Sequence, residues 1–201
     1  MQKEKMNLSL ILADLEELGH SNDSIEPERS KKYLNITRDT GEFLSVLVKS
    51  TRSQKILEVG TSNGYSTIWL ASSLPENGLV TTIEYSLQKF NEAKINFENA
   101  NLTSKIEQIH GEAKKSLIKL SGQFDIIFLD ADRSLYMSMI IEIEKLLKPG
   151  GLIVTDNAIS HEHELSEFMG YFKRKTEYSC CLVPVGKGEF LAYKSAKTKN
   201  A

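Results

Sequence analysis

Hydrophobic and polar positions along the chain follow two alternating periods. Short apolar runs predict strands at Ile56–Val59, Leu79–Glu84, Ile106–His110, Phe124–Leu129, Leu152–Thr155, Tyr178–Val183 and Phe190–Tyr193. Between them, apolar residues recur at helical spacing and predict helices at Tyr65–Leu74, Leu87–Asn101, Lys114–Leu120, Leu135–Leu147 and His161–Lys173. Strands that alternate with helices favour an α/β fold, a mostly parallel sheet covered on both faces. The last two strands are joined by a short glycine turn and should pair as a hairpin.

The segment before the first predicted strand contains two more helices. An amphipathic pattern predicts a helix over Leu8–Leu18 that ends near Gly19, and the polar stretch Asn22–Ser30 is typical of a linker. A second helix is predicted over Asp39–Val48, with Thr37 and Asp39 as candidate caps. We expect one domain, with the first helix and linker in residues 1–30, a core in 31–195 and a frayed tail in 196–201.

The stretch from Lys55 to Ser66 reads as a strand, a glycine turn and the start of a helix. Gly60 and Gly64 would let the backbone approach a ligand, although their spacing differs from the dinucleotide fingerprint. Glu58 ends the strand, and Glu84 follows about 20 residues after the turn, where an acid commonly binds ribose hydroxyls. A ligand with ribose and no pyrophosphate suggests S-adenosylmethionine. The alternative is that the glycines only form a connection.

Two other predicted strands end in oxygen-bearing side chains. Asp130 follows one strand, and Asp156 and Asn157 follow another, so parallel pairing would bring all three to the same sheet edge. Two carboxylates and one amide oxygen suit a hard cation, namely Mg²⁺ and also Mn²⁺ or Ca²⁺, better than zinc. The alternative is that these residues only cap helices or form Asx turns.

Composition narrows the class of protein. The 201 residues are 40% apolar and 26% charged, as in ordinary globular domains, and the net charge of -2 gives no electrostatic footprint for nucleic acid or membrane. No signal peptide or membrane-spanning run is expected. The two cysteines, Cys180 and Cys181, are adjacent and form neither a disulfide framework nor a zinc pattern, which favours a cytoplasmic location.

In one collinear order, these motifs resemble the cation-dependent, S-adenosylmethionine-dependent O-methyltransferases, the catechol and caffeoyl-CoA class. The matching segments are Ile56–Ala71, Phe124–Asp132 and Leu146–Asn157, and Thr37–Leu44 also resembles the family's segment before its first core strand. The resemblance implies a Rossmann-like class I methyltransferase fold, a seven-stranded, mostly parallel sheet with a C-terminal antiparallel hairpin. It also implies a small hydroxylated acceptor and a homodimer.

The resemblance further implies roles for particular residues. It places the divalent ion on Asp130, Asp156 and Asn157, and assigns catalytic roles to Asp130 and to the position of Arg133. Positions that match its cofactor site are Ile36, Thr37, Glu58, Gly60, Thr61, Ser62, Gly64, Ser66, Glu84, Tyr85, Gly111, Glu112, Ala113 and Asp130. Of these, Glu84 corresponds to the ribose contact, Ala113 lies by the adenine, and Ile36 and Thr37 lie over cofactor and substrate.

The sequence departs from the family in two places. Arg133 replaces a lysine that is often assigned as general base, and arginine cannot accept that proton but could stabilise an oxyanion; alternatively it is a surface residue. After Asn157 the family often has a tryptophan and a longer insertion, so a more open acceptor pocket is expected here. His161 and His163 could act as a base, but an exposed first helical turn capped by Ser160 is favoured. Two other functions stay open: methylation of hydroxyuridine in tRNA, and non-catalytic S-adenosylmethionine binding.

Overall fold

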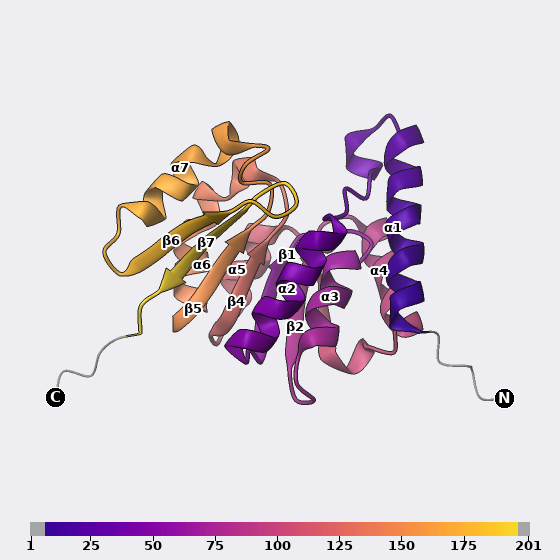
Figure 1. Ribbon diagram of the computed structural model, residues 1–201, viewed down its shortest axis with the longest axis horizontal. Helices are drawn as coiled ribbons and strands as arrows, with labels where there is room; N and C mark the ends of the chain where they lie inside the picture. Colours follow the sequence, from indigo (N-terminus) through magenta and orange to yellow (C-terminus); the bar gives the residue numbers. More distant parts are fainter. Residues whose placement is uncertain (1–6, 197–201) are drawn as a thin grey trace.

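The structure is a computed structural model that describes residues 7–196. A seven-stranded sheet with the order β3-β2-β1-β4-β5-β7-β6 forms its centre (Figure 1). The strands are β1 (Lys55–Val59), β2 (Leu79–Glu84), β3 (Ile106–His110), β4 (Phe124–Leu129), β5 (Leu147–Thr155), β6 (Tyr178–Val183) and β7 (Glu189–Lys194). Strands β1 to β5 pair in parallel, whereas β7 runs antiparallel to both β5 and β6. The predicted parallel sheet and C-terminal hairpin are thus confirmed.

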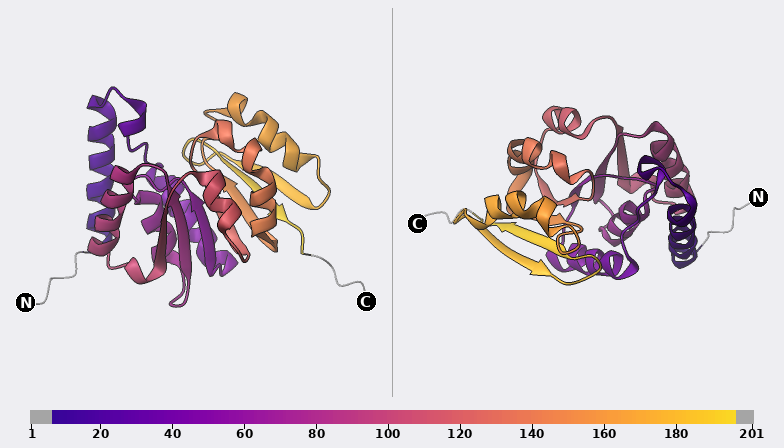
Figure 2. Two further views of the ribbon diagram at one scale, coloured as in Figure 1. Left: turned by 180° about the vertical axis from the view of Figure 1, so that it is seen from behind. Right: turned by 90° about the horizontal axis from the view of Figure 1, so that it is seen from above.

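Helices cover both faces of the sheet, as Figure 2 shows from behind and from above. They are α1 (Leu8–Ile25), α2 (Arg38–Thr51), α3 (Tyr65–Ser73), α4 (Leu87–Asn99), α5 (Ala113–Lys119), α6 (Ile140–Leu146) and α7 (Glu162–Lys173), with short 3₁₀ turns between them. One core cluster contains residues of α1, α2, α3 and α4 together with one face of the sheet. The other contains residues of α5, α6 and α7 together with the opposite face. Within residues 7–196, no helix combines the length and apolar character that crossing a bilayer requires.

Alternation along β1 explains how the strand serves both cores. Leu57 and Val59 belong to the cluster under α5 to α7, whereas Ile56 belongs to the cluster under α1 to α4. Because successive side chains in a strand point to opposite faces, Glu58 points to the same side as Ile56, toward α3. A charged residue in this core position needs hydrogen-bond partners, which are described below.

The N-terminal prediction was partly wrong. Helix α1 continues past Gly19 to Ile25, so it includes the first part of the segment that was predicted as a linker. Gly19 is buried, because the Asn35 side chain packs against it and donates from Nδ2 to the Leu15 carbonyl oxygen at 3.0 Å. A glycine that usually ends a helix therefore serves here as a packing position. The predicted frayed tail at 196–201 lies outside the described residues except for its first residue.

Other details of the elements also differ from the predictions. The predicted helix Leu135–Leu147 is two 3₁₀ turns followed by α6, and in the first part the Tyr136 hydroxyl pairs with the backbone of Ala131. Strand β5 begins at Leu147 rather than Leu152, with an irregular register where it passes Phe124 and Ile126. Ser160 does not cap α7; His161 holds that position, and the Ser160 Oγ lies 2.9 Å from His161 Nδ1.

Candidate functional site

The candidate site lies at the carboxyl edge of the parallel strands. The Asp130 N–H donates to the Val59 carbonyl at 3.0 Å and the Asp156 N–H donates to the Leu129 carbonyl at 3.1 Å, so neighbouring strands end side by side. The turn between β6 and β7, yellow in Figure 1, meets the start of α2 at this edge. Gly186 in that turn donates its N–H to Asp39 Oδ2 at 3.0 Å. Segments far apart in sequence therefore converge here.

Two positions of the turn after β1 require glycine, because of close packing as well as backbone conformation. Gly60 has φ +104°, and a Cβ built on it would lie 2.1 Å from the Asp130 carbonyl oxygen. Gly64 has φ +89°, and a Cβ there would lie 2.4 Å from the Phe97 ring. Both predicted glycines are therefore required. Gly60 in particular lets the turn approach Asp130 closely.

Glu58 is buried beneath this turn. Its Oε1 accepts from the Ser66 hydroxyl at 2.6 Å, and its Oε2 accepts from Thr67 at 2.5 Å and from Thr82 at 2.6 Å. Burial raises the pKa of Glu58 from 4.5 to about 7, and these three hydrogen bonds oppose the rise. Glu58 therefore ties β1 to α3 and β2, and its influence on a ligand would be indirect, through the position of the turn.

Glu84 is placed to accept hydrogen bonds at the end of β2. Its Oε2 accepts from the Ser62 N–H and its Oε1 from the Ser86 N–H, both at 2.8 Å. Each carboxylate oxygen has a second lone pair that a ribose hydroxyl could use. Thr61 is buried with its hydroxyl 2.6 Å from that of Thr82, whereas the Tyr85 side chain is largely exposed.

The turn from β3 into α5 lies beside Glu84. The Gly111 N–H donates to the Glu84 carbonyl at 2.8 Å, and Ala113 begins α5. Glu112 turns outward and pairs with Lys115 at 2.6 Å. A pocket of about 410 Å³ is lined in part by Gly111 and Glu112, which precede the residue predicted to lie by the adenine. None of the acidic residues of the predicted cation site line this pocket.

Ile36 and Thr37 lead into α2. Ile36 is buried, and the Thr37 hydroxyl accepts from the Thr40 N–H at 3.4 Å, so Thr37 is the N-cap of α2 as predicted. The same hydroxyl donates to Thr40 Oγ1 at 3.1 Å, and Thr40 in turn donates to Glu189 Oε1 at 3.4 Å. The start of α2 is thereby connected to the acidic part of the site.

The three predicted metal ligands converge. Asn157 Nδ2 lies 2.6 Å from Asp156 Oδ2 and 3.4 Å from Asp130 Oδ1, and turning the amide would present its oxygen instead. Asn157 has φ +66°, a conformation that asparagine tolerates. Burial, followed by the charges of Asp156 and Glu58, raises the pKa of Asp130 well above its usual range. This all-oxygen, negatively charged set fits a hard divalent cation.

Glu189, the first residue of β7, is an acidic neighbour that the sequence pattern did not indicate. It is fully buried. Burial, followed by the charge and hydrogen bonding of Asp156, raises the pKa of Glu189 to about 11. Because the return strand of the hairpin runs antiparallel, its beginning lies at the edge where β4 and β5 end. That topology was the signal that could have identified it.

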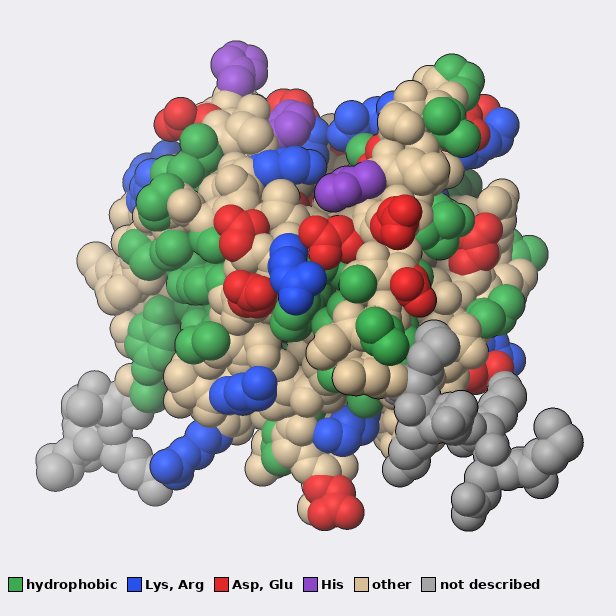
Figure 3. Space-filling model, turned by 45° about the vertical axis from the view of Figure 1, so that its right-hand side comes forward, with side chains coloured by type: hydrophobic (Ala, Val, Ile, Leu, Met, Phe, Trp, Pro, Cys, Tyr) green, Lys and Arg blue, Asp and Glu red, His purple; other side chains and the backbone are tan. Residues whose placement is uncertain are grey.

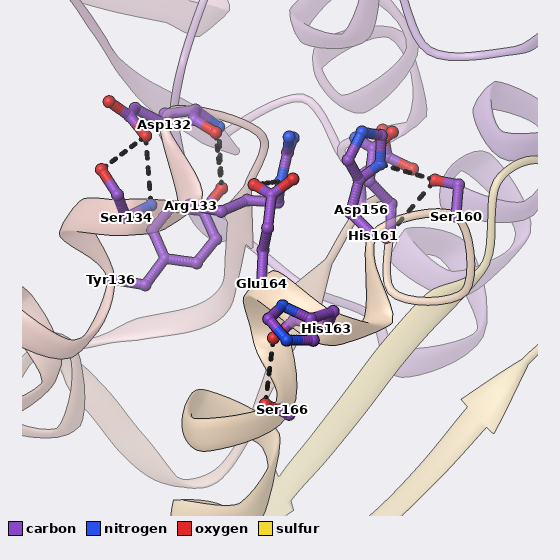
Figure 4. A network of polar contacts seen from close by, with 12 residues as sticks. Asp132, Arg133, Ser134, Tyr136, Asp156, Ser160, His161, His163, Glu164 and Ser166 are labelled. Carbon is purple, nitrogen blue, oxygen red and sulfur yellow. Dashed lines mark hydrogen bonds and ion pairs between the residues drawn. The ribbon is translucent and has the colours of Figure 1, made fainter.

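Arg133 is neither a free surface residue nor an unpaired cation. Its Nε donates to Glu164 Oε2 on α7 at 2.9 Å (Figure 4). The Arg133 side chain is only 11% exposed. Its charge reaches Asp130, where it opposes the rise in the pKa of that carboxyl. His161 is half-buried beside Ser160, and His163 is exposed on the first turn of α7.

Comparison with protein families and relatives agrees with this geometry. The family model described as O-methyltransferase matches residues 7–194. A catechol O-methyltransferase of Niastella koreensis is 38% identical over 144 residues, covering 70% of this chain and 65% of the relative. One from Mycobacterium tuberculosis is 34% identical over 125 residues, covering 62% and 57%. The chain thus spans less than two thirds of the length of these two curated relatives.

Solved structures show the same fold over most of both chains. An O-methyltransferase from Bacillus cereus in complex with SAH has a TM-score of 0.79 and 26% identity, covering 92% of this chain and 91% of that one. TomG from Streptomyces achromogenes, in complex with SAM and involved in tomaymycin synthesis, has a TM-score of 0.79 and 25% identity, covering 96% and 92%. With the family model spanning nearly every described residue, the chain belongs to the O-methyltransferase family.

Proposed function

We propose that this protein transfers the methyl group of S-adenosylmethionine to a hydroxyl of a small molecule that bears two neighbouring oxygens, with the help of a divalent cation. The observation that supports the proposal most is the contact between the glycine turn and the acidic cluster at the sheet edge. The glycine turn and the acidic cluster touch there, since Gly60 packs directly against the Asp130 carbonyl. Cofactor and cation would therefore lie next to each other, as methyl transfer to a chelated oxygen requires.

The cofactor half of the site would be formed by the glycine turn and the end of β2. Glu84 would accept hydrogen bonds from the ribose, and the β3–α5 turn would border the adenine. S-adenosylmethionine supplies an electrophilic methyl group when bound. Glu58 keeps the turn in place through three hydroxyls, so it supports binding without touching the ligand.

The cation half would be held by Asp130, Asp156 and Asn157, with Mg²⁺ as the first choice and Mn²⁺ or Ca²⁺ as alternatives. Such an ion lowers the pKa of an acceptor hydroxyl and stabilises its oxyanion. Arg133 would add a positive charge near Asp130 that Glu164 partly compensates. Arginine does not accept a proton, so no lysine-type base acts at this position.

A catechol-like acceptor is favoured over tRNA. Two relatives are named catechol O-methyltransferases, and a catechol carries the neighbouring oxygens that the proposed cation would bind. On the face drawn in Figure 3, Lys and Arg side chains are interspersed with Asp and Glu and form no continuous stripe. Of the basic residues near α5 and α7, Lys115 is paired with Glu112 and Lys175 with Glu144. These acidic partners offset part of the positive charge that phosphate binding requires.

An acceptor screen tests this function. Purified protein would be incubated with labelled S-adenosylmethionine and Mg²⁺, and with catechols, monohydroxylated phenols or hydroxylated and unmodified tRNA. We expect transfer to catechols and none to monophenols, because only the former chelate a cation. Transfer to hydroxylated tRNA alone would show that the substrate is tRNA and not a small molecule. No transfer to any acceptor, with cofactor binding intact, would favour a non-catalytic S-adenosylmethionine-binding protein.

A further inference from the structure

Strand pairing places Glu189 at the proposed cation site. Thr155 lies opposite Phe190 in the antiparallel pair of β5 and β7. Continuing this register by one residue sets Asp156 opposite Glu189. The Ala158 N–H donates to the Gly188 carbonyl at 2.7 Å, which holds the next turn of chain against the same strand. The position of Glu189 beside Asp156 is therefore fixed by backbone pairing.

The Glu189 carboxylate is incompletely satisfied although it is fully buried. Oε1 has one long hydrogen bond, 3.4 Å from Thr40 Oγ1, and Oε2 has no hydrogen-bond donor among the described residues. Buried carboxylate oxygens normally have donors, because an unpaired one loses its hydration without compensation. Its acidic neighbours are Asp156 and Asp130. A buried oxygen without a donor, near two other carboxylates, indicates a missing positively charged or proton-donating partner.

The geometry limits how Glu189 could meet a cation. Within residues 7–196, no three His, Cys, Asp or Glu side chains converge closely enough to form a metal cluster by themselves. A direct bond from all three carboxylates to one ion is therefore not indicated. A water bound to the ion could instead donate to Glu189, because hard cations keep several waters and those waters are strong donors.

We propose that Glu189 is a further residue of the divalent-cation site, where it accepts a hydrogen bond from a water bound to the ion and increases the affinity for that ion. This inference rests on the proposed function, since it requires the cation. It adds a negative charge from the C-terminal hairpin to the ligands that β4 and β5 supply. Residues that orient the waters or ligands of a metal typically change its affinity by about 10-fold to 100-fold.

A simpler role would be structural. A protonated Glu189 could donate a hydrogen bond to Asp156 and hold it in place. The two roles differ in their response to Glu189→Gln, because a glutamine amide donates the same hydrogen bond but carries no negative charge. Glu189→Asp keeps the charge and shortens the side chain. The pair of variants therefore separates charge from hydrogen bonding.

The test is Mn²⁺ binding to the full chain, measured by the electron paramagnetic resonance signal of the unbound ion. The variants are Glu189→Gln, Glu189→Asp and Asp156→Asn, with Glu167→Gln on the exposed face of α7 as the charge-matched control. Thermal unfolding without metal would check that each variant folds. We expect Glu189→Gln to weaken Mn²⁺ binding by about 10-fold or more, Glu189→Asp to weaken it less, and Glu167→Gln to leave it unchanged.

The possible failures are distinguishable. If Asp156→Asn abolishes Mn²⁺ binding while Glu189→Gln binds as tightly as the wild type, the role proposed for Glu189 is wrong and the cation site stands. If the wild type does not bind Mn²⁺, the cation-assisted function is wrong, and the role of Glu189 is wrong with it. If Glu189→Gln does not fold, Glu189→Ala also removes the charge and takes its place, and Mn²⁺ binding by folded Glu189→Ala as tight as in the wild type would overturn the proposal.

Discussion

Replacing Gly60 with alanine tests whether the glycine turn and the cation site form one unit. A side chain at φ +104° is strained, at a cost of roughly 1–2 kcal/mol. The new Cβ would also lie 2.1 Å from the Asp130 carbonyl oxygen, so backbone on one side must move. Overpacking of this kind costs about 1–3 kcal/mol. We therefore expect Gly60→Ala to lower the free energy of unfolding by about 2–5 kcal/mol.

Gly122 provides a matched control. Its φ is +95°, but a Cβ built there meets no atom within 4 Å. Gly122→Ala should therefore cost only the conformational part, roughly 1–2 kcal/mol. Urea unfolding of both variants measures the difference, and Mn²⁺ titration measures the displacement of Asp130. We expect weaker Mn²⁺ binding in Gly60→Ala only. Equal stability of the two variants, with unchanged Mn²⁺ binding in both, would refute the close approach of turn and cation site.

Three further outcomes are expected. The unfolded chain loses the Glu58 proton near pH 4.5 and the folded chain near pH 7, so stability should fall by up to roughly 3 kcal/mol as the pH rises between these values. Urea unfolding at pH 5 and pH 8 should show this fall in the wild type and a smaller one in Glu58→Gln; parallel pH profiles would be evidence against it. Glu84→Ala should weaken cofactor binding by about 1.5–3 kcal/mol, measured by calorimetry. Glu98→Ala, at an exposed position, should bind the cofactor as the wild type does. Equal affinities of the two variants would show that Glu84 does not bind the ribose. Arg133→Met should lower kcat/KM for all catechols by roughly tenfold or less, because Glu164 already compensates part of its charge, and Arg133→Lys should help the least acidic acceptors most. Unchanged rates in Arg133→Met would show that this charge has no role.

The sheet and the edge that carries the site could be predicted from sequence because the signals are local. Apolar runs identify strands, and a parallel sheet brings their polar ends together without knowledge of any particular contact. Asp130, Asp156 and Asn157 therefore met as expected. The glycines were also recognisable, although the reason for Gly60, its contact with the Asp130 carbonyl, depends on a strand far away in sequence.

What could not be predicted depends on contacts between distant segments. Helix α1 continues past Gly19, where Asn35 packs against the glycine, and propensity alone gives no information about such packing. Arg133 is held by Glu164, a residue that is brought near only when α7 packs on the sheet. Glu189 stands at the start of a short strand, where an acid ordinarily suggests an exposed hairpin turn. Its burial follows from the antiparallel return of β7 beside β5.

The cation dependence of methyl transfer is the most direct test of the proposed function. Initial rates with a catechol and saturating S-adenosylmethionine would be measured after EDTA treatment and after titration with Mg²⁺, for the wild type and for folded Asp130→Ala. We expect EDTA to abolish transfer, Mg²⁺ to restore it in the wild type, and folded Asp130→Ala to stay inactive at every Mg²⁺ concentration. Full transfer in excess EDTA would contradict a cation-assisted reaction and would leave Asp156 and Asn157 with only the structural role of a turn.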